Sequence, residues 1–147
     1  MKIENLVLRV AISASLAVSG VVHAYLYTNG YRDIPTVGPA FLAQGSVFCA
    51  LALLILVGGP AWLQVVAAVG AAGSLVAFAL SRTIGLFGFI ETGWRPSPYT
   101  WLSVVAEVMT ILLVGTAFIR RRARSSERRR RTTLSNNRAE LKPSELR

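Results

Sequence analysis

The sequence has one cysteine, one histidine and few acidic side chains. Cys49 alone cannot form a disulfide or a dithiol redox pair within one chain, and it cannot supply a cysteine-based metal site. A single histidine, His23, excludes bis-histidine haem ligation within a monomer. The 7 Asp and Glu residues show no spacing typical of metal ligands and no recognisable pairing of a nucleophile with a base. The sequence therefore predicts no metal site and no catalytic residue.

Long apolar runs, by contrast, fill most of the chain. Hydrophobic residues make up 53% of the 147 positions, which is too apolar for an ordinary soluble domain. Four runs cover residues 6–27, 38–57, 61–80 and 100–119. Each is about 20 residues long, close to the length that a helix needs to cross ~30 Å of hydrocarbon at about 1.5 Å per residue. We expect an all-α fold, a membrane-spanning antiparallel four-helix bundle over residues 1–119, followed by a largely disordered basic tail over residues 120–147.

Positive charge is concentrated after the last apolar run. Residues 120–147 hold 11 of the 16 Lys and Arg residues and 3 of the 7 acids. Because such a cluster resists translocation, the tail is expected to stay in the cytoplasm. Counting back through four helices places the N-terminus on the same side and the connections 28–37 and 81–99 outside. The sequence thus predicts a multi-pass protein of the inner (plasma) membrane with both termini cytoplasmic.

The arginine-rich start of the tail follows the membrane directly. We expect it to bind anionic lipid headgroups, at about 1 kcal/mol per basic residue. Nucleic acid is disfavoured as a partner, because the tail lacks the aromatic side chains that help to bind single strands. The predicted headgroup anchor consists of Arg120, Arg121, Arg122, Arg124, Arg128, Arg129, Arg130 and Arg131.

The first apolar run has a second interpretation, as a cleaved signal peptide. Val22, His23 and Ala24 resemble the small-x-small pattern that precedes a cleavage site. However, the apolar run continues past this point, and cleavage would leave only three helices. We therefore favour a retained first helix.

Several polar side chains interrupt the apolar runs. Glu107 lies seven residues into the fourth run, about 10 Å from its outer end at 1.5 Å per residue, where an ionisable group is costly and is a functional candidate by default. Thr100, Ser103, Glu107 and Thr110 recur at i+3 and i+4 spacing, which predicts a polar stripe that faces protein. The candidate polar site in the outer half of the bundle consists of His23, Tyr27, Gln44 and Glu107. The alternative is that these side chains only bond one another and hold the helices in register.

The connection 81–99 is the longest between predicted helices. Long connections in compact domains are usually functional or disordered, and the apolar residues here argue for contact with the membrane surface or with the bundle. Its charged groups could meet an anionic ligand, but an ion pair between Glu91 and an arginine is favoured. The candidate interaction residues of the outer connections are Arg32, Asp33, Arg82, Glu91, Trp94 and Arg95.

The sequence resembles small, largely uncharacterised four-helix integral membrane proteins of actinobacteria. The shared features are His23 and Tyr27, the stretch 82–86 with Glu91, Trp94 and Pro96, and Glu107. The resemblance covers residues 1–119 and implies an inner-membrane address and a polar outer face. A looser similarity to DoxX-like membrane proteins, for which redox roles have been proposed, rests on the number of helices and the outer-end histidine. The cysteine pair is missing here, and neither resemblance implies a catalytic residue.

The concentration of aromatic and charged residues on the outer side favours a non-enzymatic accessory or protein-interaction module, whose outer loops would bind an exported or membrane protein. The alternative is a membrane protein that handles a small molecule, a proton or a quinone through the Glu, His and Gln cluster. An envelope enzyme is a third, weaker hypothesis because a nucleophile and base are missing. No cofactor is predicted, although the alternative has room for a quinone or a lipid. The small-residue helix faces are compatible with a homo-oligomer.

Overall fold

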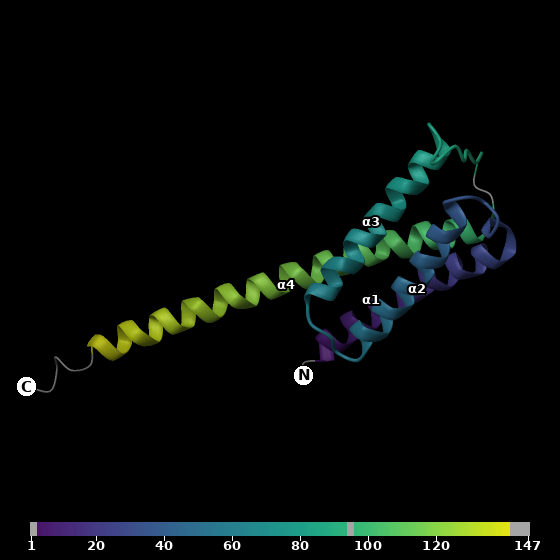
Figure 1. Ribbon diagram of the computed structural model, residues 1–147. Coiled ribbons are helices and arrows are strands. Elements are labelled where there is room, and N and C mark those ends of the chain that lie inside the picture. Colours follow the sequence, from purple (N-terminus) through teal and green to yellow (C-terminus); the bar gives the residue numbers. More distant parts are fainter. Residues whose placement is uncertain (1–2, 94–95, 142–147) are drawn as a thin grey trace, which may run out of the picture. The chain divides into compact units, whose positions relative to one another are not determined.

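The computed structural model describes residues 3–93 and 96–141, which are helical apart from their connections. Four long helices and a short π-helical segment follow one another: α1 (Ile3–Leu26), η1 (Tyr27–Tyr31), α2 (Val37–Leu56), α3 (Trp62–Arg82) and α4 (Tyr99–Leu141) (Figure 1). Successive long helices run antiparallel, and each is long and apolar enough to cross a membrane. The chain is therefore an all-α, multi-pass membrane protein, and the predicted fold class is confirmed.

The observed helices lie close to the predicted ones over most of the chain. The starts of α2, α3 and α4 differ from the predicted starts by one residue, and α1 begins three residues earlier than predicted. The large difference is at the end of α4, which does not stop at Ile119 but continues to Leu141. The hydropathy of the fourth run marks where the apolar sequence ends, which is not where the helix ends.

The tail is helical as far as it is described, where the sequence predicts a largely disordered segment. Arg and Glu are good helix formers, and Arg131 bonds Glu127 at 2.7 Å with i,i+4 spacing. The chain divides into two compact units between Val114 and Gly115, and this helical tail belongs to the second unit. Everything described below for the site lies in the first unit.

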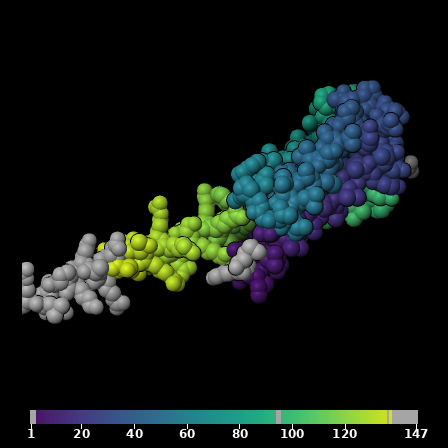
Figure 2. All heavy atoms as spheres, turned by 60° about the horizontal axis from the view of Figure 1, so that its bottom comes forward, coloured from purple at the N-terminus to yellow at the C-terminus, as the bar shows by residue number. Residues whose placement is uncertain are grey.

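Within the first unit, α1 and α2 lie against each other (Figure 2), and they pack closely at two glycines. A Cβ on Gly20 would lie 2.9 Å from Sγ of Cys49 and 3.2 Å from the carbonyl oxygen of Gly45. A Cβ on Gly45 would in turn lie 3.0 Å from the carbonyl oxygen of Gly20. Small residues that let backbones approach are a usual basis of helix association in membranes. This contact fixes α1 against α2 beside two site residues, His23 and Gln44.

The first unit has two ends, which we name by their connections. The loop end is formed by η1 and the connection 83–98, and the turn end is formed by the short turn at Gly58 and Gly59. Toward the turn end the interior is mainly apolar, with Ile12 and Ile55 almost completely buried, and it includes the polar Ser13 and Gln64. Toward the loop end, the polar side chains around Glu107 lie beside a buried apolar cluster of Val22, Leu26, Tyr31 and Val37. Many large apolar side chains face outward, as expected for a surface in contact with lipid.

Candidate functional site

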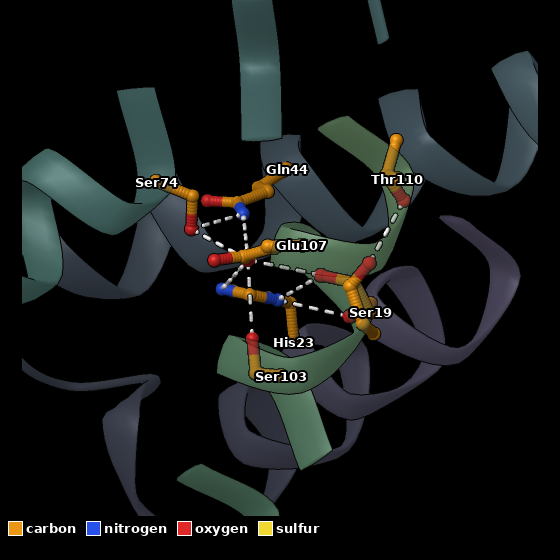
Figure 3. A network of polar contacts seen from close by, with 8 residues as sticks. Ser19, His23, Gln44, Ser74, Ser103, Glu107 and Thr110 are labelled. Atoms are coloured by element: carbon orange, nitrogen blue, oxygen red, sulfur yellow. Dashed lines mark hydrogen bonds and ion pairs between the residues drawn. The ribbon is translucent and has the colours of Figure 1, made fainter. Parts of the chain in front are cut away.

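Side chains from all four long helices converge on one carboxylate oxygen of Glu107 (Figure 3). Glu107 is only 1% exposed. Its Oε1 accepts hydrogen bonds from Ser19 Oγ of α1 (3.0 Å), Gln44 Nε2 of α2 (3.2 Å), Ser74 Oγ of α3 (2.7 Å) and Ser103 Oγ of α4 (3.1 Å). A carboxylate buried this deeply is tolerated only when such donors replace water.

The donors are positioned by helical spacing and by a hydrogen bond between two of them. Ser103 precedes Glu107 by four residues on α4, so both lie on one face of that helix. Ser19 and His23 have the same spacing on α1. Ser74 Oγ accepts a hydrogen bond from Gln44 Nε2 at 2.7 Å and donates one to Glu107 Oε1. The polar stripe predicted on the fourth helix is confirmed, because all four of its members are buried.

His23 faces the same carboxylate oxygen through one ring nitrogen, while its other ring nitrogen contacts the backbone. Its Nδ1 lies 2.9 Å from the carbonyl oxygen of Ser19, and because a carbonyl only accepts, Nδ1 carries a proton. The other nitrogen, Nε2, lies 3.9 Å from Oε1 of Glu107. Phe41 and Phe48 pack on the ring at centroid distances of 5.0 and 6.5 Å. In a neutral imidazole, Nε2 would present a lone pair to a carboxylate, so a proton on either group relieves the repulsion.

A cavity of about 100 Å³ extends from this cluster to the loop end. His23, Gln44 and Glu107 line its deep part, while Tyr31 and Glu91 line its mouth. Apolar and aromatic side chains of the helices and of the 83–98 connection form the walls between them: Leu26, Val37, Phe41, Phe78, Leu86 and Phe89. The cavity is large enough to hold water, and it offers polar partners at both ends.

At the mouth of the cavity, three side chains form a second polar cluster. Arg82 Nη2 and Glu91 Oε2 form an ion pair at 3.0 Å, and the hydroxyl of Tyr31 donates a hydrogen bond to Glu91 Oε1. Tyr31 also stacks on Phe41 with ring centroids 4.7 Å apart. The backbone N–H of Glu91 donates to the carbonyl of Ser81 at 3.0 Å, which brings the connection back onto α3. The predicted ion pair between Glu91 and an arginine is thus present.

The structure brings together three of the four residues predicted for the polar site. His23, Gln44 and Glu107 line the cavity, whereas Tyr27 does not. Tyr27 begins η1, where the π-helical turn and the non-helical backbone at Asn29 and Gly30 break the i+4 face of α1. As a result Tyr31 takes the position at the cavity.

Other predicted residues lie apart from the cavity. Arg32 and Asp33 are exposed in the first connection, and neither lines the cavity. Trp94 and Arg95 fall outside the described residues. The arginines of the predicted headgroup anchor lie on α4 beyond the first unit, and Arg122 stacks over the ring of Phe118 at 4.6 Å.

Two site residues were not predicted from the sequence. Ser74 carries a weak signal, because it is a hydroxyl inside the third apolar run. Tyr31 carries none, because its position depends on the backbone of η1. In residues 3–93 and 96–141, no group of three or more His, Cys, Asp and Glu side chains could hold a metal ion.

Comparisons with known proteins add no relative. No family, curated protein or solved structure matches the chain. The resemblances to actinobacterial and DoxX-like membrane proteins therefore stay predictions, and the function has to be argued from the site itself.

Proposed function

We propose that this is a proton-handling membrane protein, in which Glu107 and His23 bind and release one proton inside a hydrated cavity. The observation that carries the proposal is the position of His23 Nε2, 3.9 Å from Glu107 Oε1, while Nδ1 is held by the Ser19 carbonyl. Two acceptors that face each other at this distance in a buried site are stable only with a proton on one of them. The proton comes from water in the cavity and returns to it.

A purely structural network would not need an acid at this position. A glutamine at position 107 could accept the same hydrogen bonds through its amide oxygen without an ionisable group inside the membrane. Ionisable groups at such depth are costly, and their presence by default indicates function. The cavity next to Glu107 gives this acid access to water, which a packing role does not require.

The size of the cavity favours water and protons over a larger ligand. About 100 Å³ is smaller than the roughly 150 Å³ cavity that holds one benzene molecule in an engineered protein. The ring of a quinone would need the walls to move apart. The quinone or lipid considered from the sequence is therefore less well supported than a proton.

The partner-binding module favoured by the sequence has less support from the geometry. Arg82 and Glu91 form an ion pair, and Glu91 also accepts a hydrogen bond from Tyr31. Both charges therefore already have a partner at the cavity mouth. Arg32 and Asp33 are exposed and could contact a partner, but nothing near them indicates its chemistry. This hypothesis stays a prediction.

Infrared difference spectroscopy on the purified protein in lipid tests the proposal. Between two pH values, protonation of a buried carboxylate produces a carboxylic acid C=O band that Glu107→Gln should remove. Glu127→Gln is the matched control, because Glu127 is an exposed acid on α4 that lies outside the cavity. A wild-type spectrum without a band assignable to Glu107 across the accessible pH range would refute the proposal.

A further inference from the structure

We infer that the Glu107 and His23 site exchanges protons with one side of the membrane only, the side of the loop end. The inference rests on the proposed function, and it specifies that function further. A proton that enters and leaves by the same route is sensed or used on one side. The site is then a proton receptor and not a step on a path across the membrane.

The route to the loop end is the cavity itself. Its lining is continuous from Glu107 and Ser103, through Thr100 of the same helix, to Arg82 and Glu91 at the mouth. From Glu107 to Thr100 the rise is about 10 Å at 1.5 Å per residue. Polar atoms at both ends can bond the waters that fill this length.

Toward the turn end the helices close over a mainly apolar plug, which also holds the buried side chains of Ser13 and Gln64. Ile12, Leu16, Ala67 and Ala71 are 0% exposed and Ile55 is 1% exposed. The plug is thick, because α2 continues for 12 residues from Gln44 to Leu56, which is about 18 Å at 1.5 Å per residue. None of the plug residues lines the cavity. Apolar packing of this kind holds no ordered water, so it blocks proton exchange.

One pair of hydroxyl groups lies on the plug side of Glu107 and has to be considered as a proton wire. Ser15 Oγ and Thr110 Oγ1 are 2.8 Å apart, one helical turn from Ser19 and close to one turn from Glu107. Ser15 also lies 3.0 Å from the carbonyl oxygen of Ile12, and Thr110 lies 2.9 Å from that of Ala106. Each hydroxyl has a single proton, so two backbone carbonyls compete for the two protons available. Among the described residues, the two hydroxyls bond, apart from each other, only backbone carbonyls of their own helices, and the buried Ser13 Oγ on this side makes no hydrogen bond that would extend the chain.

The charged and titratable groups around the site agree with one-sided access. His23 of α1 faces Glu107 directly, and α2 and α3 contribute the neutral Gln44 and Ser74 at this depth. The remaining groups that line the same cavity are all at its mouth: Tyr31 of η1, Arg82 at the end of α3 and Glu91 of the 83–98 connection.

Cysteine accessibility from the two sides of the membrane tests this inference. In a Cys49→Ser background, Ala77→Cys places a thiol in the cavity wall and Ala67→Cys places one in the plug. The probe is Ag⁺, added to right-side-out or to inverted membrane vesicles. The thiols that stay free are then counted with a fluorescent maleimide after denaturation.

We expect Ag⁺ to block the Ala77→Cys thiol in one vesicle orientation only and the Ala67→Cys thiol in neither. Blocking of Ala77→Cys from both sides, or from neither side, overturns the inference. Val104→Cys, on the α4 wall of the same cavity, replaces Ala77→Cys if that variant does not fold.

Proton flux into liposomes that enclose a pH-sensitive dye provides the second measurement. With a potassium gradient and valinomycin as the driving force, wild-type and Glu107→Gln liposomes should leak equally. A wild-type leak that Glu107→Gln abolishes overturns one-sided access and leaves the proposed function intact. Failure of the proposed function is seen separately, as the absence of the Glu107 infrared band.

Discussion

Tyr31 and Glu91 come from the two connections at the loop end, and the tyrosine hydroxyl donates a hydrogen bond to Oε1 of Glu91. The same carboxylate holds Arg82 through its other oxygen. One acid thus joins η1, the end of α3 and the 83–98 connection across the mouth of the cavity. All three residues line the same cavity as Glu107.

Loss of the Tyr31 hydroxyl should loosen the mouth of the cavity. Tyr31→Phe keeps the ring stacked on Phe41 but removes one hydrogen bond to a carboxylate, worth about 1.5 to 3 kcal/mol when a charged group takes part. We expect faster amide hydrogen exchange in residues 83–93, measured by mass spectrometry. Tyr27→Phe is the control, because Tyr27 lies outside the cavity, and equal exchange in both variants would contradict the prediction.

The two ways of neutralising Glu107 should differ in stability. Glu107→Gln retains an oxygen for the four donors, so its thermal stability in detergent should stay within about 1 kcal/mol of wild type. Glu107→Ala leaves buried donors from four helices without an acceptor, at about 1 to 3 kcal/mol for each donor that finds no new partner. A Glu107→Ala protein as stable as Glu107→Gln would show that the donors are satisfied in another way.

Two glycine substitutions should change stability in opposite directions. Gly20→Ala puts a methyl group 2.9 Å from Sγ of Cys49 and 3.1 Å from its backbone nitrogen, which forces α1 from α2 and should cost about 1 to 3 kcal/mol. Gly73→Ala adds a methyl group on α3 with nothing within 4 Å, and it should stabilise the helix by up to about 1 kcal/mol. Thermal unfolding of the two variants measures the difference, and a neutral Gly20→Ala would refute the close packing.

The arginines of the tail should respond to lipid charge. We expect residues 120–131 to be protected from trypsin in nanodiscs with anionic lipid more than in nanodiscs with neutral lipid. The effect should weaken at high salt, because each arginine contributes only about 1 kcal/mol of electrostatic attraction. Substitution of Arg128, Arg129, Arg130 and Arg131 by glutamine should weaken the binding of the tail to anionic lipid in proportion to the charge removed. This binding is measured without trypsin, because the substitutions also remove cleavage sites. Equal protection in both lipids would contradict the predicted anchor.

The sequence was sufficient to predict the four spans and the core of the site. Run length and hydropathy locate helices well, since a bilayer demands about 20 apolar residues for each crossing. The convergence of His23, Gln44 and Glu107 followed from counting residues along each run, because three polar side chains at similar depth in a small bundle have few other places to go. The ion pair of Glu91 was predicted because ion pairs between surface arginine and acidic residues are common.

The features that the sequence could not supply depend on backbone geometry and on helix continuation. Tyr31 replaces Tyr27 at the cavity because the backbone of η1 is kinked at Asn29 and Gly30, where Gly30, with φ at 136°, turns the chain. The helical periodicity of the sequence does not indicate such a turn. Hydropathy likewise does not register that α4 continues through arginine-rich sequence to Leu141, because a solvated helix needs only good helix formers and has no apolar face to detect.

The four donors that meet at Oε1 of Glu107 also have a mechanical consequence. Three of them come from helices other than α4, so a change in the tilt of one of these helices against α4, as in a thinner or thicker bilayer, changes the length of at least one of these three bonds. Fewer donors leave the negative charge less well solvated. Bilayer thickness and lateral tension would therefore act on the same oxygen atom that holds the proton, with no separate sensing element between them.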